Sequence, residues 1–276
     1  MVRIAFASDL HFDVNQLDAK KLIQQQIDFL NRQEVDYFFV TGDTFNDFNK
    51  TLEYFEQFNN LARNTKAYFI AGNHDMVRGV KYYQLEEPQS KYYLHHKTLL
   101  IPDTNFAIVG NNGWYDYSFA KTRLNLTDND YYHFKQTYWV DAVIDAPLSD
   151  RERFDRTLAQ IEESIEQVQA VGQPNRHIIL LTHFVPRLEF IKFTDYEKWN
   201  ISTAMLGGVG LGELIDRYQL DYVDFGHLHI RTPDTQIGQT TYLHQPLGYR
   251  TKRRHEWENA DFMTEFMQTT KIIEIN

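Results

Sequence analysis

The sequence predicts an α/β fold, because two kinds of segment alternate along its first half. Short apolar runs at residues 2–7, 37–40 and 67–71 have the length and composition of buried strands. Between them, residues 18–33 and 52–61 place apolar side chains at intervals of three and four, as an amphipathic helix does. This succession implies at least three neighbouring parallel or mixed strands that are covered by helices.

The second half continues the pattern after an interruption. Strands are predicted at residues 99–101 and 106–109, which are joined by a turn, and at 178–181, 222–225, 240–243 and 271–275. A helix is expected to begin at Ser149, because Ser149 and Glu152 have capping-box spacing, and to end at Gly172, Pro174 and Asn175. A further helix is predicted at residues 206–218.

The interruption, at residues 111–148, is rich in aromatic side chains and follows no regular period. It is too aromatic to be disordered and too irregular to be a framework element. Two interpretations stay open: a packed surface excursion, or a cap that shapes a pocket. Because no linker or repeat is evident, we expect one domain over residues 1–276 with a cap-like insertion at about 111–148.

The composition narrows the classes of function. The formal net charge of −10 argues against a protein that coats nucleic acid or an anionic membrane. The absence of cysteine excludes disulfides and thiolate metal sites. No apolar run approaches the roughly 20 residues of a spanning helix, and the first residues form a strand pattern rather than a signal peptide. A cytoplasmic protein without membrane association is therefore expected; the oligomeric state stays open.

Polar blocks follow five of the predicted strands at the same end. They are Ser8-Asp9-Leu10-His11, Gly42-Asp43-Thr44-Phe45-Asn46-Asp47, Gly72-Asn73-His74-Asp75, Thr182-His183 and Gly226-His227-Leu228-His229. Loops at the carboxyl ends of strands are where α/β proteins usually place their chemistry. In Asp9-x-His11 and His227-x-His229, the i, i+2 spacing directs both polar groups to one side if the backbone stays extended.

Together these blocks favour a metal site, because Asp and His side chains that cluster in space are common metal ligands. Imidazole, carboxylate and amide oxygen without sulfur suit Mn²⁺, Fe²⁺/Fe³⁺ or Zn²⁺. The remaining histidines lack this context, and most of them are interpreted as structural. These are His95, His96, His133, His177, His244 and His255.

The ordered set of blocks from residue 9 to residue 229 resembles the calcineurin-like metallophosphoesterase family. The resemblance implies a four-layer αββα sandwich, in which two mixed β-sheets lie face to face with helices outside. It also implies two divalent metal ions. One ion would be held by Asp9, His11 and His229, the other by Asn73, His183 and His227, with Asp43 bridging both. His74 would be a catalytic histidine that binds no metal, oriented by Asp75.

The substrate contacts are less strongly specified. Arg187 follows His183 closely and Arg250 follows the last block, so either guanidinium could grip a phosphate or carboxylate; a solvated basic face is the alternative. Trp114 could stack on a base or sugar, or could belong to the core of the cap. Asp47 is interpreted as a helix N-terminal residue rather than a support for a ligand.

The resemblance implies a metal-dependent phosphoesterase that hydrolyses a small or mid-sized phosphate mono- or diester by in-line attack of a metal-bridging hydroxide. A nucleic-acid phosphodiesterase is the second hypothesis, against which the net charge argues. A catalytically silent scaffold of the same fold is the third; every ligand block here is whole, which argues against it.

Overall fold

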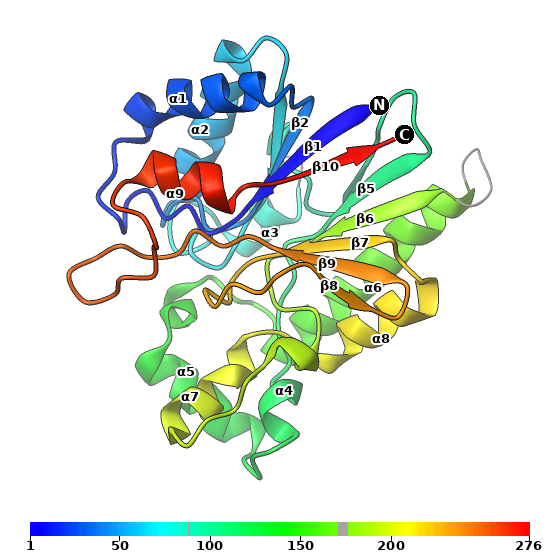
Figure 1. The fold of residues 1–276 in the computed structure, drawn as a ribbon. Helices are drawn as coiled ribbons and strands as arrows, with labels where there is room; N and C mark the ends of the chain where they lie inside the picture. The colour runs from blue at the N-terminus through cyan, green and yellow to red at the C-terminus, as the bar shows by residue number, and fades with distance from the viewer. Residues whose placement is uncertain (88, 171–175) are drawn as a thin grey trace.

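Two β-sheets form the centre of the molecule (Figure 1). The computed structural model describes residues 1–87, 89–170 and 176–276. The first sheet has the strand order β10 (Lys271–Ile275), β1 (Val2–Ala7), β2 (Tyr37–Thr41), β3 (Lys66–Ile70). Strands β1, β2 and β3 are parallel, and β10 runs antiparallel to β1.

The second sheet is larger and also mixed. Its strands are, in spatial order, β4 (Lys97–Leu100), β5 (Phe106–Gly110), β6 (His177–Leu181), β7 (Tyr222–Phe225), β9 (Thr240–His244) and β8 (Thr235–Ile237). The four inner strands are parallel, whereas β4 and β8 form antiparallel edges. The prediction of two mixed sheets is confirmed.

Helices cover the outer faces of both sheets, as Figure 1 shows. The first sheet is covered by α1 (Ala19–Arg32), α2 (Phe48–Leu61) and α9 (Phe262–Thr269). The second is covered by α6 (Asp150–Ala170) and α8 (Val209–Tyr218). The four-layer arrangement is thereby confirmed. The expected end of the long helix at Gly172, Pro174 and Asn175 lies outside the described residues.

Side-chain alternation along the strands builds two kinds of core. On β1, Ile4 and Phe6 point toward the second sheet and share a buried cluster with Ile179 of β6. The alternate residues Ala5 and Ala7 belong to the cluster beneath the helices of the first sheet. Strands buried on both faces give continuous apolar runs, which is why the sequence marks them clearly. Burial of each large aliphatic side chain contributes about 1.5–3 kcal/mol.

The segment at residues 111–148 is more regular than its sequence suggests. It contains α4 (Ser118–Lys121), α5 (Asp128–Tyr138) and the 3₁₀ helix η1 (Val140–Val143). A capping box begins α5, in which the Thr127 side chain accepts from the backbone of Asp130 and the Asp130 side chain accepts from that of Thr127. The short α7 (Glu197–Ser202) packs against α5 and α4.

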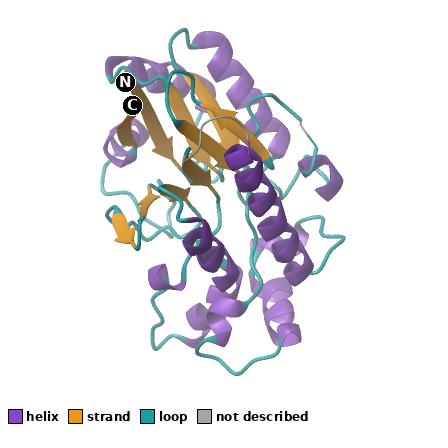
Figure 2. Cartoon of the chain, turned by 90° about the vertical axis from the view of Figure 1, so that its right-hand side faces the viewer, coloured by secondary structure: helices purple, strands orange, loops and turns teal. Residues whose placement is uncertain are grey.

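Helices α4, α5 and α7 gather at the end of the molecule opposite to both chain termini, in Figure 1 and in the turned view of Figure 2. Shorter elements complete the description: α3 (Tyr82–Leu85), η2 (Leu188–Phe190) and η3 (Thr203–Met205) are helical turns, and isolated bridges join Ser8 to Pro246 and Arg250 to His255. No helix among the described residues is both long and apolar enough to span a membrane.

Candidate metal centre

The polar blocks converge where the carboxyl ends of the two sheets meet. Blocks after β1, β2 and β3 come from the first sheet, and blocks after β6 and β7 from the second. Three overlapping groups of Asp and His place their ligand atoms within 4.8 Å of one another. The groups are Asp9, His11 and His229; His11, Asp43 and His74; and Asp43, His183 and His227.

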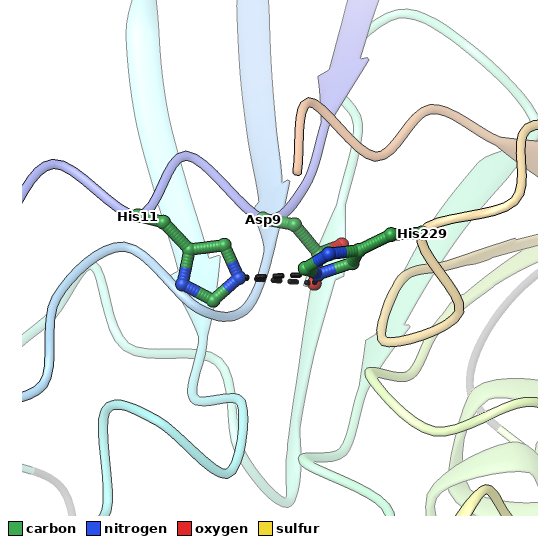
Figure 3. A group of neighbouring side chains, drawn as sticks. All are labelled: Asp9, His11 and His229. Carbon is green, nitrogen blue, oxygen red and sulfur yellow. Dashed lines mark hydrogen bonds and ion pairs between the residues drawn. The ribbon is translucent and has the colours of Figure 1, made fainter. Parts of the chain in front are cut away.

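The first half of the centre consists of Asp9, His11 and His229, which are drawn in Figure 3. The Nε2 atoms of His11 and His229 lie 3.1 Å apart, and His229 Nε2 is 3.0 Å from Asp9 Oδ1. In Figure 3 the two rings approach the same space from opposite sides, one from the loop after β1 and the other from the loop after β7. Three ligand atoms of the type expected for one ion thus face each other.

The second half consists of His183, His227 and Asn73, with Asp43 between the halves. His183 Nε2 lies 3.1 Å from Asn73 Oδ1 and 3.4 Å from Asp43 Oδ2. The same Asp43 oxygen lies 3.6 Å from His11 Nε2 in the first half. Asp43 Oδ2 therefore lies between the two halves, close to a histidine of each.

The charges of this cluster fit a bound cation. Burial of the His229 ring opposes its protonation, yet the carboxylates of Asp9 and Glu256 raise its pKa to about 10. Burial also lowers the pKa of His183, and Asp43 more than reverses this effect, so the pKa rises to about 9. Carboxylates that hold protons on buried imidazoles equally attract a divalent ion, which competes with those protons. The donor set, without sulfur, suits Mn²⁺, iron or Zn²⁺.

The backbone at the ligands is strained rather than extended. Asp9, His11, Asp43 and His227 all have positive φ angles, of 55°, 45°, 57° and 68°. Such conformations are uncommon for residues with a side chain and cluster at functional sites. The assumption that Asp9-x-His11 and His227-x-His229 stay extended is therefore wrong. Turns, rather than strand alternation, bring these side chains together.

Hydrogen bonds between loops hold these turns. The Asp9 amide donates to the Gly42 carbonyl at 3.0 Å, and the His11 amide donates to the Asp43 carbonyl at 2.9 Å. Gly42 itself has a φ of +93°, and a Cβ there would collide with the His183 ring and with the backbone of Gly72. The close approach of three loops thus requires glycine at position 42.

His74 lies beside the metal ligands and faces the solvent-accessible cavity. Its Nδ1 is 2.7 Å from Asn46 Oδ1, and its Nε2 is 3.0 Å from the Tyr249 hydroxyl. Because Asn46 Oδ1 only accepts, Nδ1 carries the proton in this pair. Its backbone amide donates to Asp43 Oδ1 at 2.8 Å. Asn46 and Tyr249 were not singled out from the sequence; the position of Asn46 inside the Gly42–Asp47 block was the one available signal.

The Asp75 carboxylate is bonded to groups other than the His74 ring that it was expected to orient. The Asp75 carboxylate accepts hydrogen bonds from the amides of Asp43, Thr44, Phe45 and Gly72 at 2.7–3.1 Å and from the Thr51 hydroxyl at 2.6 Å. Turns expose backbone amides that need buried acceptors, and Asp75 supplies one. Asp75 therefore fixes the loops that carry Asp43 and Asn73.

Asp47 has the structural role that was expected of it. It is the N-cap of α2, and its side chain accepts from the Asn49 amide. Among the histidines interpreted as structural, His95 contacts Glu86 and His177 contacts Asp221. In the described part of the chain, neither is in a group that could hold a metal.

A cavity of about 700 Å³ opens above the ligands. Asp43, Asn73, His74, His227 and His229 line its floor. Aromatic side chains of its walls come from α5, the residue after it, α7 and the residue before α7. They are Phe134, Tyr138, Trp139, Tyr196 and Trp199.

Two cations, Lys198 and Arg254, also line this cavity. Lys198 Nζ lies 4.6 Å from the centre of the Tyr138 ring, and the Arg254 guanidinium lies 5.3 Å from that of Tyr249.

None of the three substrate contacts expected from the sequence, Arg187, Arg250 and Trp114, lines this cavity. Arg187 is paired with Glu189 at 2.8 Å and Asp216 at 2.6 Å, which neutralise its charge. The Arg250 guanidinium donates to the Asn259 carbonyl on a different face.

Trp114 is buried in the core. Its ring stacks on Tyr115, and its indole NH donates to Asp150. Arg187 and Arg250 thus lie outside the cavity although they follow ligand blocks in the sequence, and Trp114 belongs to the core.

Comparison with known proteins places this site in a family. A sequence model described as calcineurin-like phosphoesterase matches residues 2–231. None of the curated proteins compared with the chain matches it significantly in sequence.

Solved structures share the fold at low identity. The phosphopantetheinyl hydrolase of Mycobacterium tuberculosis is 16% identical, with 89% of each chain covered and a TM-score of 0.66. A dimetal phosphatase from Danio rerio is 10% identical, with 89% of this chain and 87% of that chain covered and a TM-score of 0.52. The TT1561 protein of Thermus thermophilus is 9% identical, with 89% of each chain covered and a TM-score of 0.53.

The family match covers the five ligand blocks and most of both sheets. Its extent agrees with the four-layer architecture and with the grouping of Asp and His side chains at the sheet ends. The chain therefore belongs to the calcineurin-like phosphoesterase family and is a metal-dependent phosphoester hydrolase.

Proposed function

We propose that the chain hydrolyses a small or mid-sized organic phosphate ester, a mono- or diester, at a dinuclear metal centre. The observation that carries this proposal is the convergence of the seven expected ligands, four of which line one open cavity. Clusters of buried titratable groups that line a cleft are the general mark of a catalytic site.

Each residue has a distinct part in the proposed reaction. Asp9, His11 and His229 would hold one ion, Asn73, His183 and His227 would hold the other, and Asp43 would contribute to both. Mn²⁺, iron and Zn²⁺ are the candidate ions. Two divalent ions bound there neutralise phosphoryl oxygens and supply a nucleophile from water for in-line displacement.

His74 acts on the other side of the phosphorus in this proposal. Its ring lines the cavity, and its Nε2 lies 3.0 Å from the Tyr249 hydroxyl. In the imidazolium form, with a second proton on Nε2, the ring can donate that proton to the leaving oxygen or offset charge in the transition state. Asn46 fixes the ring by accepting from Nδ1.

The cavity indicates the class of leaving group. A volume of about 700 Å³ fits an organic molecule of drug size and is far larger than a free phosphate needs. Tyr138 and Tyr196, at its rim, are 60% and 64% exposed, so they offer flat apolar surface to a ligand. Lys198 supplies a positive charge for a second anionic group, in a protein whose net charge is −10.

We also propose that the 111–148 insertion acts as a cap within a single domain. Phe134, Tyr138 and Trp139 come from this stretch and line the cavity, opposite Trp199 of α7. The cap interpretation is favoured over that of a mere surface excursion, because the insertion supplies a wall of the site.

The test is a metal analysis followed by an ester panel. Purified protein should contain about two divalent ions and should hydrolyse nitrophenyl phosphates with Mn²⁺, Fe²⁺ or Zn²⁺. The panel should include a phosphopantetheinyl ester, nucleotides and sugar phosphates. Asp43→Asn should abolish turnover while circular dichroism stays unchanged. Full activity of Asp43→Asn would contradict the proposal. Faster hydrolysis of single-stranded DNA than of any small ester would favour a nuclease instead.

A further inference from the structure

Two carboxylates outside the five ligand blocks each hold one ligand of the metal centre. Asp141 contacts Asn73 in one half, and Glu256 contacts His229 in the other. We propose that Asp141 and Glu256 are positioning residues, each of which sets the metal affinity of its own half. This inference rests on the proposed function, because it assumes that Asn73 and His229 bind metal.

Asp141 fixes the orientation of the Asn73 amide. Its Oδ1 accepts from Asn73 Nδ2 at 2.6 Å, so Asn73 Oδ1 is directed the other way, to 3.1 Å from His183 Nε2. An asparagine amide can flip, and only the oxygen is a useful metal ligand. Because the Asp141 carboxylate accepts from the amide nitrogen of Asn73, it disfavours the flipped amide, in which the oxygen would face Asp141. Asp141 is itself held by the Tyr115 hydroxyl, which donates to its other oxygen at 2.9 Å.

The burial of Asp141 supports a dedicated role. The side chain is 3% exposed, and an unpaired carboxylate at such a position would cost much free energy. Both of its oxygens are used, one for a metal ligand and one for the aromatic core of the insertion. The residue therefore joins the 111–148 insertion to the second half of the centre.

Glu256 performs the equivalent task for His229. Its Oε2 accepts from His229 Nδ1 at 2.7 Å and from the Tyr249 amide at 2.7 Å. This contact fixes a proton on Nδ1 of His229. Nε2, which faces Asp9 and His11, is then the atom free to bind a metal. Carboxylates that accept from the distal nitrogen of a metal-bound histidine orient the ring and increase its basicity.

The backbone at Gly248 leaves space for the contact between Glu256 and His229. Gly248 has a φ of +78°, and a Cβ there would lie 2.6 Å from Glu256 Oε2 and 3.4 Å from His229 Nδ1. Any side chain at position 248 would displace the carboxylate from the ring. The segment of residues 246–257 thus approaches the metal centre closely enough to complete it.

Neither carboxylate can be found from the ligand motifs. Asp141 lies in the 3₁₀ helix η1 of the aromatic insertion, far from the blocks in sequence. Glu256 lies beyond residue 231, where the family match ends. The five blocks therefore supply the ligands, whereas two segments outside those blocks set their orientation.

The test compares metal stoichiometry and affinity in matched variants. Asp141→Leu and Glu256→Met have similar shape and no acceptor; Asp141→Asn and Glu256→Gln keep an acceptor oxygen. Each protein is stripped with a chelator and titrated with Mn²⁺, and bound ions are counted by elemental analysis after dialysis. Asp155→Asn and Glu258→Gln, which change exposed acids on α6 and in the C-terminal segment, are the controls.

We expect the wild type and both controls to bind two ions. Asp141→Leu and Glu256→Met should each bind one ion about 10–100-fold more weakly and should keep the other. The double variant should lose both ions, because the two carboxylates act on different halves. Asp141→Asn and Glu256→Gln should recover most of the affinity but remain about threefold weaker, because a neutral acceptor is weaker than a carboxylate.

Two ions bound with wild-type affinity by Asp141→Leu and by Glu256→Met would overturn the inference. A double variant that keeps one ion would also overturn it, because both carboxylates would then act on the same half. If Asp141→Leu does not fold, Asp141→Asn decides alone, and wild-type affinity in that variant counts against the proposal. Failure of the wild type to bind metal or hydrolyse any ester would instead refute the proposed function.

Discussion

Replacement of His74 by glutamine separates catalysis from metal binding. The imidazole is held between Asn46, 2.7 Å from Nδ1, and Tyr249, 3.0 Å from Nε2, while the backbone amide donates to Asp43. His74→Gln removes the ring and keeps the backbone amide, so the hydrogen bond to Asp43 persists. Both expected ions should therefore still bind.

The size of the effect depends on the leaving group. Loss of a positioned general acid typically lowers the rate by about 10²–10⁴-fold, which is about 2.7–5.4 kcal/mol of transition-state stabilisation. Nitrophenolate leaves without a proton, whereas an alkoxide requires one. We therefore expect the full loss in kcat for an alkyl phosphate and about tenfold or less for a nitrophenyl phosphate.

The assay measures kcat and KM on both esters, together with metal content, for His74→Gln and Asn73→Leu. Asn73→Leu removes an expected ligand and should lose one ion, whereas His74→Gln should keep two. An equal loss of kcat on both esters would refute proton donation by His74. A loss of metal in His74→Gln as large as that in Asn73→Leu would refute the separation of roles.

Three further predictions concern stability and specificity. Burial raises the pKa of Glu86, but hydrogen bonds from His95 and Gln160 outweigh this effect and lower the pKa to about 2. Glu86 therefore stabilises the fold above pH ~4.5, and this stabilisation is lost as the pH falls toward ~2. Urea denaturation should show the gap between wild type and Glu86→Gln closing over that range; a constant gap would contradict this. Asp75→Leu, which leaves four backbone amides and the Thr51 hydroxyl without their acceptor, should destabilise the protein by about 3 kcal/mol or more, measured in the same way, and an unchanged midpoint would disprove the role. Lys198→Gln should raise KM about tenfold for esters with a second anionic group and leave kcat on nitrophenyl phosphate unchanged; equal effects on both would argue against the subsite.

The strand framework could be predicted because its physics is local. Strands buried on both faces are continuous apolar runs, and the carboxyl ends of parallel strands meet at one edge. The positions of Asp9, Asp43 and His183 after such runs therefore carried spatial information. The mixed character of each sheet, and the pairing of β10 with β1, depend on contacts across the whole chain and came only with the family resemblance or the structure.

The contacts between loops could not be predicted, because they depend on where turns lead the chain. Tyr249 reaches His74 across 175 positions of sequence, and no local pattern marks such a contact. Arg187 was misassigned for a related reason: two carboxylates nearby on the surface pair with it, and charge patterns do not reveal partners. Helix α5 escaped notice because most of its side chains are exposed and its apolar stripe is weak.

The expected metal ligands and the aromatic walls of the cavity come from different segments of the chain, so substrate specificity can change separately from metal binding. Aromatic side chains of α5 and α7 form the walls of the cavity and can vary without touching the floor, where the strand ends carry the expected ligands. Asp141 is the exception, because it belongs to the insertion and contacts Asn73 directly. Removal of the whole insertion should therefore weaken metal binding as well as alter specificity, whereas substitutions at Tyr138 or Trp199 should alter specificity alone. In our proposal, the insertion is therefore part of the metal centre rather than an independent lid.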